Sequence, residues 1–447
     1  MRFYTVSVLA LLLGLVQVSI AEVFVSGDLS RKADLGFRLA VEGESLVVKR
    51  LVADSAAAAA GIKENDVVLA INDGKVTHAL DDRRRLDRHP GDKPLKLSLG
   101  RGGTQIDMTF TPPARAWEAM PGADSYYGVV DMPDGARLRT IIAVPEGVKK
   151  KVPAIFLAQW VSCSSLEYRE QSGGSKVQAR LVRDTRRAFI RVERSSDGDS
   201  EGPACHRLDY DTELMHYYHA FKQLLNHPRI DSNNIIIFGS SLGSTVAPLL
   251  AEKLWQDGIK VKGVMVQGGG AVSYLERMMS FERAYLERRP DVDPTTIHNE
   301  ILDRIRFYTE YFIAQRSPND IAKDSAAMKR VFNDIRGLNA ETQYGRPHAW
   351  HQQAAQHNFL KAWHTLSVPV LVVFNEFDQY EMEHGHRMIV DMINRWRPGT
   401  ASYVIQRGLG HSNYRFNSME EAYADEAGVA EPLTFARVLV DWVNTLQ

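Results

Sequence analysis

The sequence predicts an α/β protein in two parts. A small β-rich α+β domain comes first, and a larger domain with a doubly wound, mainly parallel sheet and a helical cap follows. The chain has 447 residues, more than the roughly 100–250 at which single domains usually stop. Proline and small residues gather in residues 113–122, as in a linker. Before this linker, strands and turn residues dominate; after it, strands alternate with helices.

The composition is that of a folded globular protein. Hydrophobic residues make up 44% and charged residues 24% of the chain, which are ordinary values. The formal net charge is −1. A chain this close to neutral has no strong attraction to nucleic acid or anionic lipid, so we expect neither as a partner.

The N-terminus has the pattern of an export signal. Arg2 precedes an apolar run over residues 6–18, and Ser19 and Ala21 fit the −3 and −1 positions of a cleavage site. The run is shorter than the roughly 20 residues that span a bilayer. We therefore predict that residues 1–21 are cleaved and that the protein is periplasmic or secreted, with no stable membrane span. An uncleaved anchor is the alternative.

Residues 27–112 predict the first domain. A loop runs into a strand near residue 37, and Thr77 is the expected N-cap of the longer helix. A hairpin closes the domain around a glycine-rich turn. The expected strands are 45–51, 66–71, 95–99 and 105–110, and the expected helices are 55–60 and 77–88.

This order of elements resembles a PDZ domain. Leu35, Gly36 and Phe37 are similar to the carboxylate-binding loop of that family, and residues 57–76 are similar to its most recognisable stretch. The resemblance implies that an extended peptide adds to the strand that begins at Phe37, with Leu35, Gly36, Phe37 and Leu39 as binding residues and a protein C-terminus as ligand. Asp34 departs from the glycine that often begins the loop. The alternative is a module that only packs against the second domain.

Residues 123–447 predict the second domain. Its strands are short and apolar, as in a sheet covered on both faces. A long helical stretch without strands, residues 275–363, is expected to form a cap inserted over the sheet. The expected strands are 126–130, 138–144, 154–158, 189–192, 234–238, 261–266, 370–374 and 402–405; helices include 211–225 and 245–255.

The motif GSSLG at residues 239–243 indicates a nucleophile. It follows a predicted strand and precedes a predicted helix, which is the context that a G-x-S-x-G turn requires. Ser241 must adopt a strained conformation there, and small neighbours at Gly239 and Gly243 permit it. A serine in an ordinary turn is the alternative.

A serine nucleophile needs a base that is held by an acid. In this type of fold the chain order is nucleophile, acid, histidine. Asp378 lies just past strand 370–374 and is the predicted acid, with Glu376 as the alternative. His411 is the first histidine after the last predicted strand and is the predicted base.

Residues 123–447 thus resemble the α/β-hydrolase superfamily. The resemblance implies attack by Ser241 on an acyl carbon, with His411 as base and Asp378 orienting it. The backbone N–H of Leu242 would contribute to the oxyanion hole, and Trp160 is assigned as the second donor, although the usual His-Gly is absent there. The stretch GDSEG at residues 198–202 resembles hydrolases related to dienelactone hydrolases and prolyl-oligopeptidase-like peptidases; a tight turn is its alternative.

The remaining motifs give structural predictions. Cys163 and Cys205 predict one disulfide, which could hold the loop that carries Trp160; two buried free thiols are the alternative. No complete ligand set accompanies the histidines, and no nucleotide fingerprint follows the glycine run 268–270, so we predict neither metal nor cofactor. The histidines considered as metal ligands are His206, His216 and His219. Trp350 and Trp363 are expected to pack between cap and sheet, or to line a pocket.

The predicted function is an exported serine hydrolase that cleaves an ester or thioester through a Ser-His-Asp triad and an acyl-enzyme. A serine peptidase of the prolyl-oligopeptidase-like type and a non-catalytic PDZ-type peptide-binding protein are the alternatives. The substrate would be a small molecule or a peptide, and the sequence predicts no oligomeric state.

Overall fold

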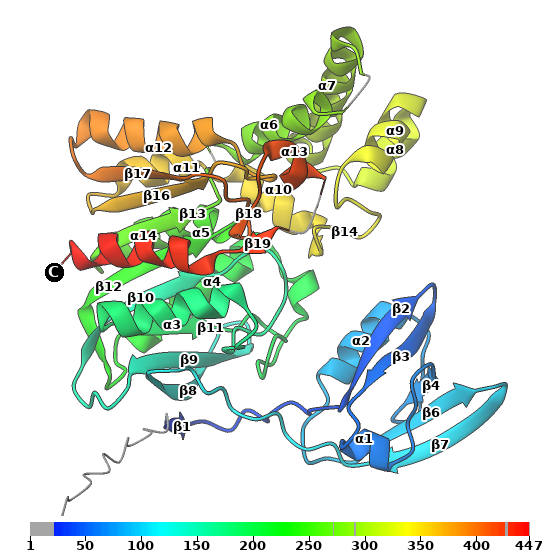
Figure 1. Cartoon of the computed structure of the whole chain (residues 1–447). Coiled ribbons are helices and arrows are strands. Elements are labelled where there is room, and N and C mark those ends of the chain that lie inside the picture. Colours follow the sequence, from blue (N-terminus) through cyan, green and yellow to red (C-terminus); the bar gives the residue numbers. More distant parts are fainter. Residues whose placement is uncertain (1–21, 271, 290–291, 425–427, 447) are drawn as a thin grey trace, which may run out of the picture.

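The computed structural model describes residues 22–270, 272–289, 292–424 and 428–446. The predicted export signal lies outside the described residues. The chain forms a smaller lobe, blue to cyan in Figure 1, and a larger lobe that carries the cap.

The smaller lobe is a twisted antiparallel sheet with two helices. The strand order is β2-β3-β4-β6-β7, with β5 paired to β4, so β2 lies at an edge beside helix α2. Apolar residues on alternate positions of the strands form its core. The elements are β2 (Phe37–Glu42), β3 (Ser45–Leu51), α1 (Ala56–Ala59), β4 (Val67–Ile71), β5 (Gly74–Lys75), α2 (Ala79–Asp87), β6 (Leu95–Arg101) and β7 (Thr104–Phe110).

The start of α2 differs from the prediction. His78, not Thr77, is the N-cap residue, and its side chain makes no capping hydrogen bond. The Asp82 carboxylate instead accepts from the backbone N–H groups of Thr77 and His78, at 2.8 and 3.1 Å. An acidic side chain inside the first turn thus reaches back to the N–H groups at and before the cap, as in the reciprocal half of a capping box.

The first described strand belongs to the larger lobe. β1 (Val23–Val25) pairs in parallel with β8 (Ala123–Asp131) at the edge of the large sheet. Phe24 stacks on Tyr126 with ring centroids 4.5 Å apart. The chain therefore leaves the large sheet, builds the smaller lobe and returns through the linker, which the sequence analysis did not predict.

The large sheet has the order β1-β8-β9-β11-β10-β12-β13-β16-β17. β9 is antiparallel to both of its neighbours, and the strands from β11 to β17 are parallel. The carboxyl ends of the parallel strands therefore share one edge, where functional residues gather in such sheets. The remaining strands are β9 (Arg137–Pro145), β10 (Val152–Ala158), β11 (Ala188–Val192), β12 (Ile230–Ser240), β13 (Gly263–Gln267), β16 (Val370–Asn375) and β17 (Ala401–Gln406).

Helices cover both faces of this sheet, as the prediction of a doubly wound sheet requires (Figure 1). Helices α3 and α14 pack on one face and the others on the opposite face, each over its own apolar cluster. The helices are α3 (Gly173–Thr185), α4 (Tyr210–Leu224), α5 (Gly243–Gln256), α11 (Phe359–Thr365), α12 (Glu383–Trp396) and α14 (Pro432–Asn444), with a short 3₁₀ turn at Cys205–Arg207.

The cap is helical but contains a short ribbon that the sequence analysis missed. β14 (Thr342–Gln343) and β15 (Arg346–Pro347) pair in antiparallel across a turn in which Tyr344 and Gly345 both have positive φ. Two-residue strands are too short to show an alternating pattern, so the prediction of no strand was wrong here. The cap helices are α6 (Tyr274–Glu287), α7 (Pro294–Tyr308), a π-turn (Thr309–Ile313), α8 (Pro318–Asp324), α9 (Ala326–Asp334) and α10 (His348–Gln356).

Trp350 and Trp363 are each 1% exposed and belong to the main apolar cluster, so they pack rather than line a pocket. After β17, a second ribbon follows, made of β18 (Tyr414–Arg415) and β19 (Val429–Ala430), with α13 (Met419–Tyr423) between its strands. The predicted strand 402–405 corresponds to β17, which is the last strand of the large sheet, although the two ribbon strands follow it in the chain. Within the described residues, no helix combines the length and apolar character needed to cross a membrane.

Candidate active site

Ser241 lies at a sharp turn between β12 and α5. Its φ is 52°, in the left-handed region that non-glycine residues rarely adopt. The glycines on either side allow this turn to form: a Cβ on Gly243 would lie 2.1 Å from the carbonyl oxygen of Ala158, and one on Gly239 would lie 2.6 Å from that of Gly243. The backbone is strained in the way that presents a nucleophile above the sheet.

Ser241, His411 and Asp378 lie in one hydrogen-bonded line. The Ser241 Oγ is 2.9 Å from His411 Nε2. The His411 Nδ1 is 2.8 and 2.9 Å from the two carboxylate oxygens of Asp378. The three residues come from the ends of β12, β16 and β17, which the parallel sheet brings to one edge. The alternative acid, Glu376, points elsewhere and binds Arg407 and the N–H of Gly408.

Three amide side chains hold the loop of His411 in place. The Gln379 Oε1 accepts from the His411 N–H at 3.1 Å, and Gln267 Nε2 donates to the His411 carbonyl at 3.2 Å. Asn375 Nδ2 donates to the carbonyl of Gly410 at 2.7 Å. The sequence analysis did not single out these residues. The available signal was their position, since all three follow or end parallel strands of the sheet.

The glycine run after β13 also belongs to the site. A Cβ on Gly268 would lie 2.9 Å from His411 Cε1, and one on Gly269 would lie 2.5 Å from the Ser241 carbonyl oxygen. We expected this run to let the cap leave the sheet. In addition, it leaves room for the imidazole and for the turn of the nucleophile.

The pKa of His411 is raised above its ordinary value of 6.5. Burial, the largest single effect, lowers it, but the charge of Asp378, its hydrogen bond and the charge of Glu381 together outweigh burial. A base must be neutral to accept the proton of Ser241.

Activity is therefore expected to fall in acid as His411 becomes protonated. Because the pKa of His411 is raised, the half-maximal point of the acid limb of kcat/KM should lie above pH 6.5. Initial rates on an activated ester between pH 4 and 9 measure it, with thermal unfolding at each pH as control. An acid limb centred below pH 6.5 in a folded enzyme would contradict this assignment.

A cavity of about 530 Å³ opens at Ser241 and His411. One side, between α3 and α14, is apolar and includes Leu157, Val177, Phe238 and Phe435. The cap side contributes Arg277 and Tyr344. Arg277 is paired with the buried Glu381, so this cation enters the cavity already neutralised.

The predicted oxyanion donors line the same cavity. Leu242 follows the nucleophile, and Trp160 lies in the loop after β10. The backbone N–H groups of Leu242 and Trp160 have no hydrogen-bond acceptor among the described residues. Both donors are free to bind a developing negative charge.

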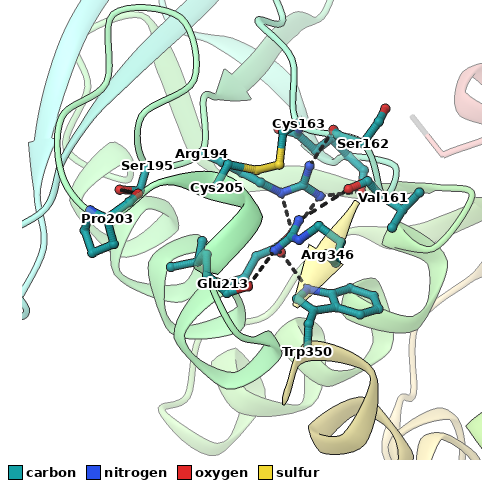
Figure 2. The surroundings of a disulfide bond; sticks show 12 residues. Val161, Ser162, Cys163, Arg194, Ser195, Pro203, Cys205, Glu213, Arg346 and Trp350 are labelled. Atoms are coloured by element: carbon teal, nitrogen blue, oxygen red, sulfur yellow. Dashed lines mark hydrogen bonds and ion pairs between the residues drawn. A yellow bond between two sulfur atoms is a disulfide. The ribbon is translucent and has the colours of Figure 1, made fainter. Parts of the chain in front are cut away.

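The predicted disulfide is confirmed. Cys163 and Cys205 are bonded with their Cα atoms 5.9 Å apart (Figure 2). The bond ties the loop that carries Trp160 to the 3₁₀ turn before α4.

The stretch GDSEG lies away from the cavity. Asp199 binds Arg31 and the N–H of Lys32, so it holds the segment that enters the smaller lobe.

The predicted peptide-binding groove has its elements in place. Leu35 and Phe37 are buried, Leu39 is half-buried, and Gly36 has a φ of 71°. The N–H of Gly36, however, donates to the Asp34 carboxylate at 3.1 Å. The residue that departs from the family pattern therefore occupies one of the donors that would bind a peptide carboxylate.

The histidines considered as metal ligands do not meet. His216 bonds Asp134 at 2.8 Å, and His206 lies 3.4 Å from Asp81. In the part of the chain that the structure describes, one group of three candidate ligand atoms lies within reach of a metal, Cys163, Asp197 and Cys205. Its sulfur atoms are joined in the disulfide, so it offers no thiolate.

The fold and this site define a protein of the hydrolase class on an α/β sheet. A family model described as alpha/beta hydrolase family matches residues 162–426, and one described as PDZ domain matches residues 25–99. The chain belongs to the alpha/beta hydrolase family and carries a PDZ domain. The interpretation as a non-catalytic peptide-binding protein is therefore set aside. The family match does not test the narrower resemblance to dienelactone hydrolases or prolyl-oligopeptidase-like peptidases, which stays a prediction.

Solved structures of esterases are similar in fold. Est1E from Butyrivibrio proteoclasticus, with ferulic acid bound, is 13% identical over 71% of this chain and 98% of its own, with a TM-score of 0.46. Carboxyl esterase 2 from Tuber melanosporum is 12% identical over 74% and 90%, with a TM-score of 0.43. A thermostable esterase from Pseudomonas putida is 13% identical over 73% and 85%, with a TM-score of 0.42. No match was found among curated proteins.

Proposed function

We propose that the protein is an exported serine hydrolase that cleaves an ester or thioester bond through an acyl-enzyme. The observation that carries the proposal is the hydrogen-bonded line from Ser241 Oγ to His411 and Asp378 at the mouth of a capped cavity. Nucleophile, base and orienting acid lie within hydrogen-bond reach of one another, which is the arrangement that acyl transfer requires.

The chemistry has two halves. In the first, Ser241 Oγ bonds to the acyl carbon while its proton moves to His411 Nε2, and the carbonyl oxygen takes the negative charge beside the N–H groups of Leu242 and Trp160. The imidazolium then protonates the leaving group as its bond to the acyl carbon breaks. In the second half, water attacks the acyl carbon while His411 takes its proton. The bond to Ser241 Oγ then breaks, His411 returns the proton to that oxygen, and the acid is released.

The cavity favours a small acyl ester over a polypeptide. Its volume of about 530 Å³ is in the range of small-molecule pockets, and the cap encloses one side. The apolar side between α3 and α14 suits an acyl group or leaving group of aliphatic or aromatic character. A peptidase is the second candidate, because a PDZ domain recognises extended peptides.

Export is proposed from the sequence and the disulfide. The apolar run before Ser19 and Ala21 has the pattern of a cleaved signal, and a disulfide persists in an oxidising compartment. N-terminal sequencing of the protein recovered from its native host tests this. A mature chain that begins at Glu22 supports cleavage and export, and a retained Met1 contradicts the cleavage.

A fluorophosphonate probe tests the enzymatic proposal. We expect the purified chain beginning at Glu22 to be labelled, the adduct to map to the peptide that contains Ser241, and an activated ester to compete with labelling. Rates on esters and thioesters, compared with those on peptides of similar size, then separate the two candidates. A folded protein that is not labelled would overturn the proposal, and faster turnover of peptides would select the second candidate.

A further inference from the structure

In the loop after β10, residues 159–163, the carbonyl groups of the first four residues accept hydrogen bonds from buried arginines. We call this segment the oxyanion loop. Arg194 donates to the carbonyl oxygens of Gln159, Trp160 and Ser162, at 3.4, 2.5 and 3.0 Å. Arg346 donates to that of Val161 at 3.3 Å. Two side chains thus hold four successive carbonyl groups.

The two arginines meet at one buried carboxylate. Arg194 follows β11, Arg346 lies on β15 of the cap, and both bind Glu213 of α4, as Figure 2 shows. Trp350 Nε1 also donates to Glu213, at 2.9 Å. We call Glu213, Arg194, Arg346 and Trp350 the Glu213 cluster. Each of the four is at most 3% exposed. Burial raises the pKa of Glu213, but the charges of Arg194 and Arg346 prevail and lower it to about 2. Glu213 therefore stays ionised across the pH 4–9 range of the activity measurement.

The direction of these carbonyl groups fixes the direction of the N–H groups. In a trans peptide unit, the C=O of one residue and the N–H of the next point in opposite directions. Because the carbonyl groups of Gln159 and Trp160 point to Arg194, the N–H groups of Trp160 and Val161 point away from it. Both residues line the cavity at Ser241, and neither N–H has an acceptor among the described residues.

The ends of the oxyanion loop are also fixed. The N–H of Gln159 donates to the Tyr217 hydroxyl at 3.3 Å, and Cys163 is held by the disulfide to Cys205. Between these two points, the loop carbonyls accept hydrogen bonds from the two arginines of the Glu213 cluster. The cluster thus orders a loop that lacks the His-Gly found at this position in many related hydrolases.

We propose that Arg194 is the positioning residue that aims the N–H groups of Trp160 and Val161 at the oxyanion. Arg346 supports this arrangement, because it binds Glu213, the partner of Arg194, and holds the carbonyl of Val161 in the same loop. The proposal rests on the proposed function, since an oxyanion forms only in acyl transfer. It adds Val161 as a donor beside Trp160, and it gives the cap a part in catalysis. Arg346 shares its hairpin with Tyr344, which lines the cavity. A substrate seated against this hairpin therefore touches the element that holds the oxyanion loop.

Arg346→Met is the deciding variant, because it removes one cluster cation and leaves every group that touches the substrate. A misplaced donor costs about 100-fold in rate, so we expect kcat to fall by about that factor with KM changed less than about threefold. Binding of a trifluoromethyl ketone, which forms the tetrahedral adduct on Ser241, should weaken by the same factor as kcat/KM. The acid limb set by His411 should not move. Arg346→Lys keeps the charge but not the forked guanidinium, so its kcat and ketone affinity should lie between those of the parent and those of Arg346→Met.

Arg304→Met is the matched control. Arg304 is a buried arginine of the cap, paired with Glu282 at 2.9 Å, and it has no contact with the oxyanion loop. We expect it to lower the melting temperature as much as Arg346→Met does, with kcat and ketone affinity retained. Should Arg346→Met not fold, Arg346→Lys and Arg194→Lys decide by the same comparison.

The proposal is overturned if ketone affinity is unchanged in Arg346→Met, or if Arg304→Met loses kcat to the same extent. Its failure can be told apart from failure of the proposed function by the fluorophosphonate probe. If the parent is labelled on Ser241 and Arg346→Met retains full kcat, only the positioning role is lost. If the parent is not labelled, both proposals fall.

Discussion

Replacing Ser241 by alanine is expected to lower kcat by about 10⁶-fold, the loss seen when a triad nucleophile is removed. Alanine has no hydroxyl to bond to the acyl carbon, so the acyl-enzyme cannot form. The substrate contacts in the cavity remain, and KM should change little. Initial rates on an activated ester, measured with enough protein to detect the residual rate, give the ratio.

Ser240→Ala is the control for this variant. Ser240 ends β12 and lines the same cavity, but it makes no hydrogen bond to His411. It should retain activity within a few-fold. If Ser241→Ala kept more than a hundredth of the parent rate, or if Ser240→Ala lost as much, another group would be the nucleophile and the proposed mechanism would fail.

The turn of the nucleophile could be predicted because its determinants are local. A strand, a G-x-S-x-G motif and a helix are adjacent in the chain, and the close contact of Gly239 with the Gly243 carbonyl follows from that geometry. The contact of Gly243 with Ala158 needs the neighbouring strand β10 as well. The positions of Asp378 and His411 could be predicted for a related reason. Parallel strands place their carboxyl ends at one edge, so the order of strands alone brings three distant segments together.

The Glu213 cluster could not be predicted in this way. Its members come from the loop after β11, from α4 and from the cap, and each follows no motif. A buried arginine has the same sequence signature as an exposed one. Only the packing of the cap on the sheet reveals that Arg194 and Arg346 bind the same carboxylate and face the same loop.

The path of the chain between the lobes was missed because its determinants lie far apart in the sequence. β1 has three residues, too few for a period, and its pairing with β8 joins residues about a hundred positions apart. The ribbon in the cap was missed because its strands, like β1, are too short to show a period. The effect of Asp34 was partly foreseen, since its departure from the family pattern was visible, but its hydrogen bond to Gly36 was not.

Asp378→Asn is expected to lower kcat by about 10⁴-fold, the loss measured when the acid of such a triad becomes an amide. The carboxylate accepts from His411 Nδ1 and from the N–H groups of Tyr380 and Glu381. An amide can keep the geometry but can present its NH₂ to Nδ1, which favours the tautomer that protonates Nε2. His411 then cannot accept the proton of Ser241.

The pH profile separates this explanation from a loss of structure. The charge of Asp378 and its hydrogen bond raise the pKa of His411, so its removal should move the acid limb of the residual activity to lower pH. Glu376→Gln removes a carboxylate from the same loop, but one that binds Arg407 and Gly408. It should leave both kcat and the acid limb unchanged. If Glu376→Gln instead reproduced the loss and the shift, the acid of the site would be Glu376, and the loop after β16 would have to rearrange when substrate binds.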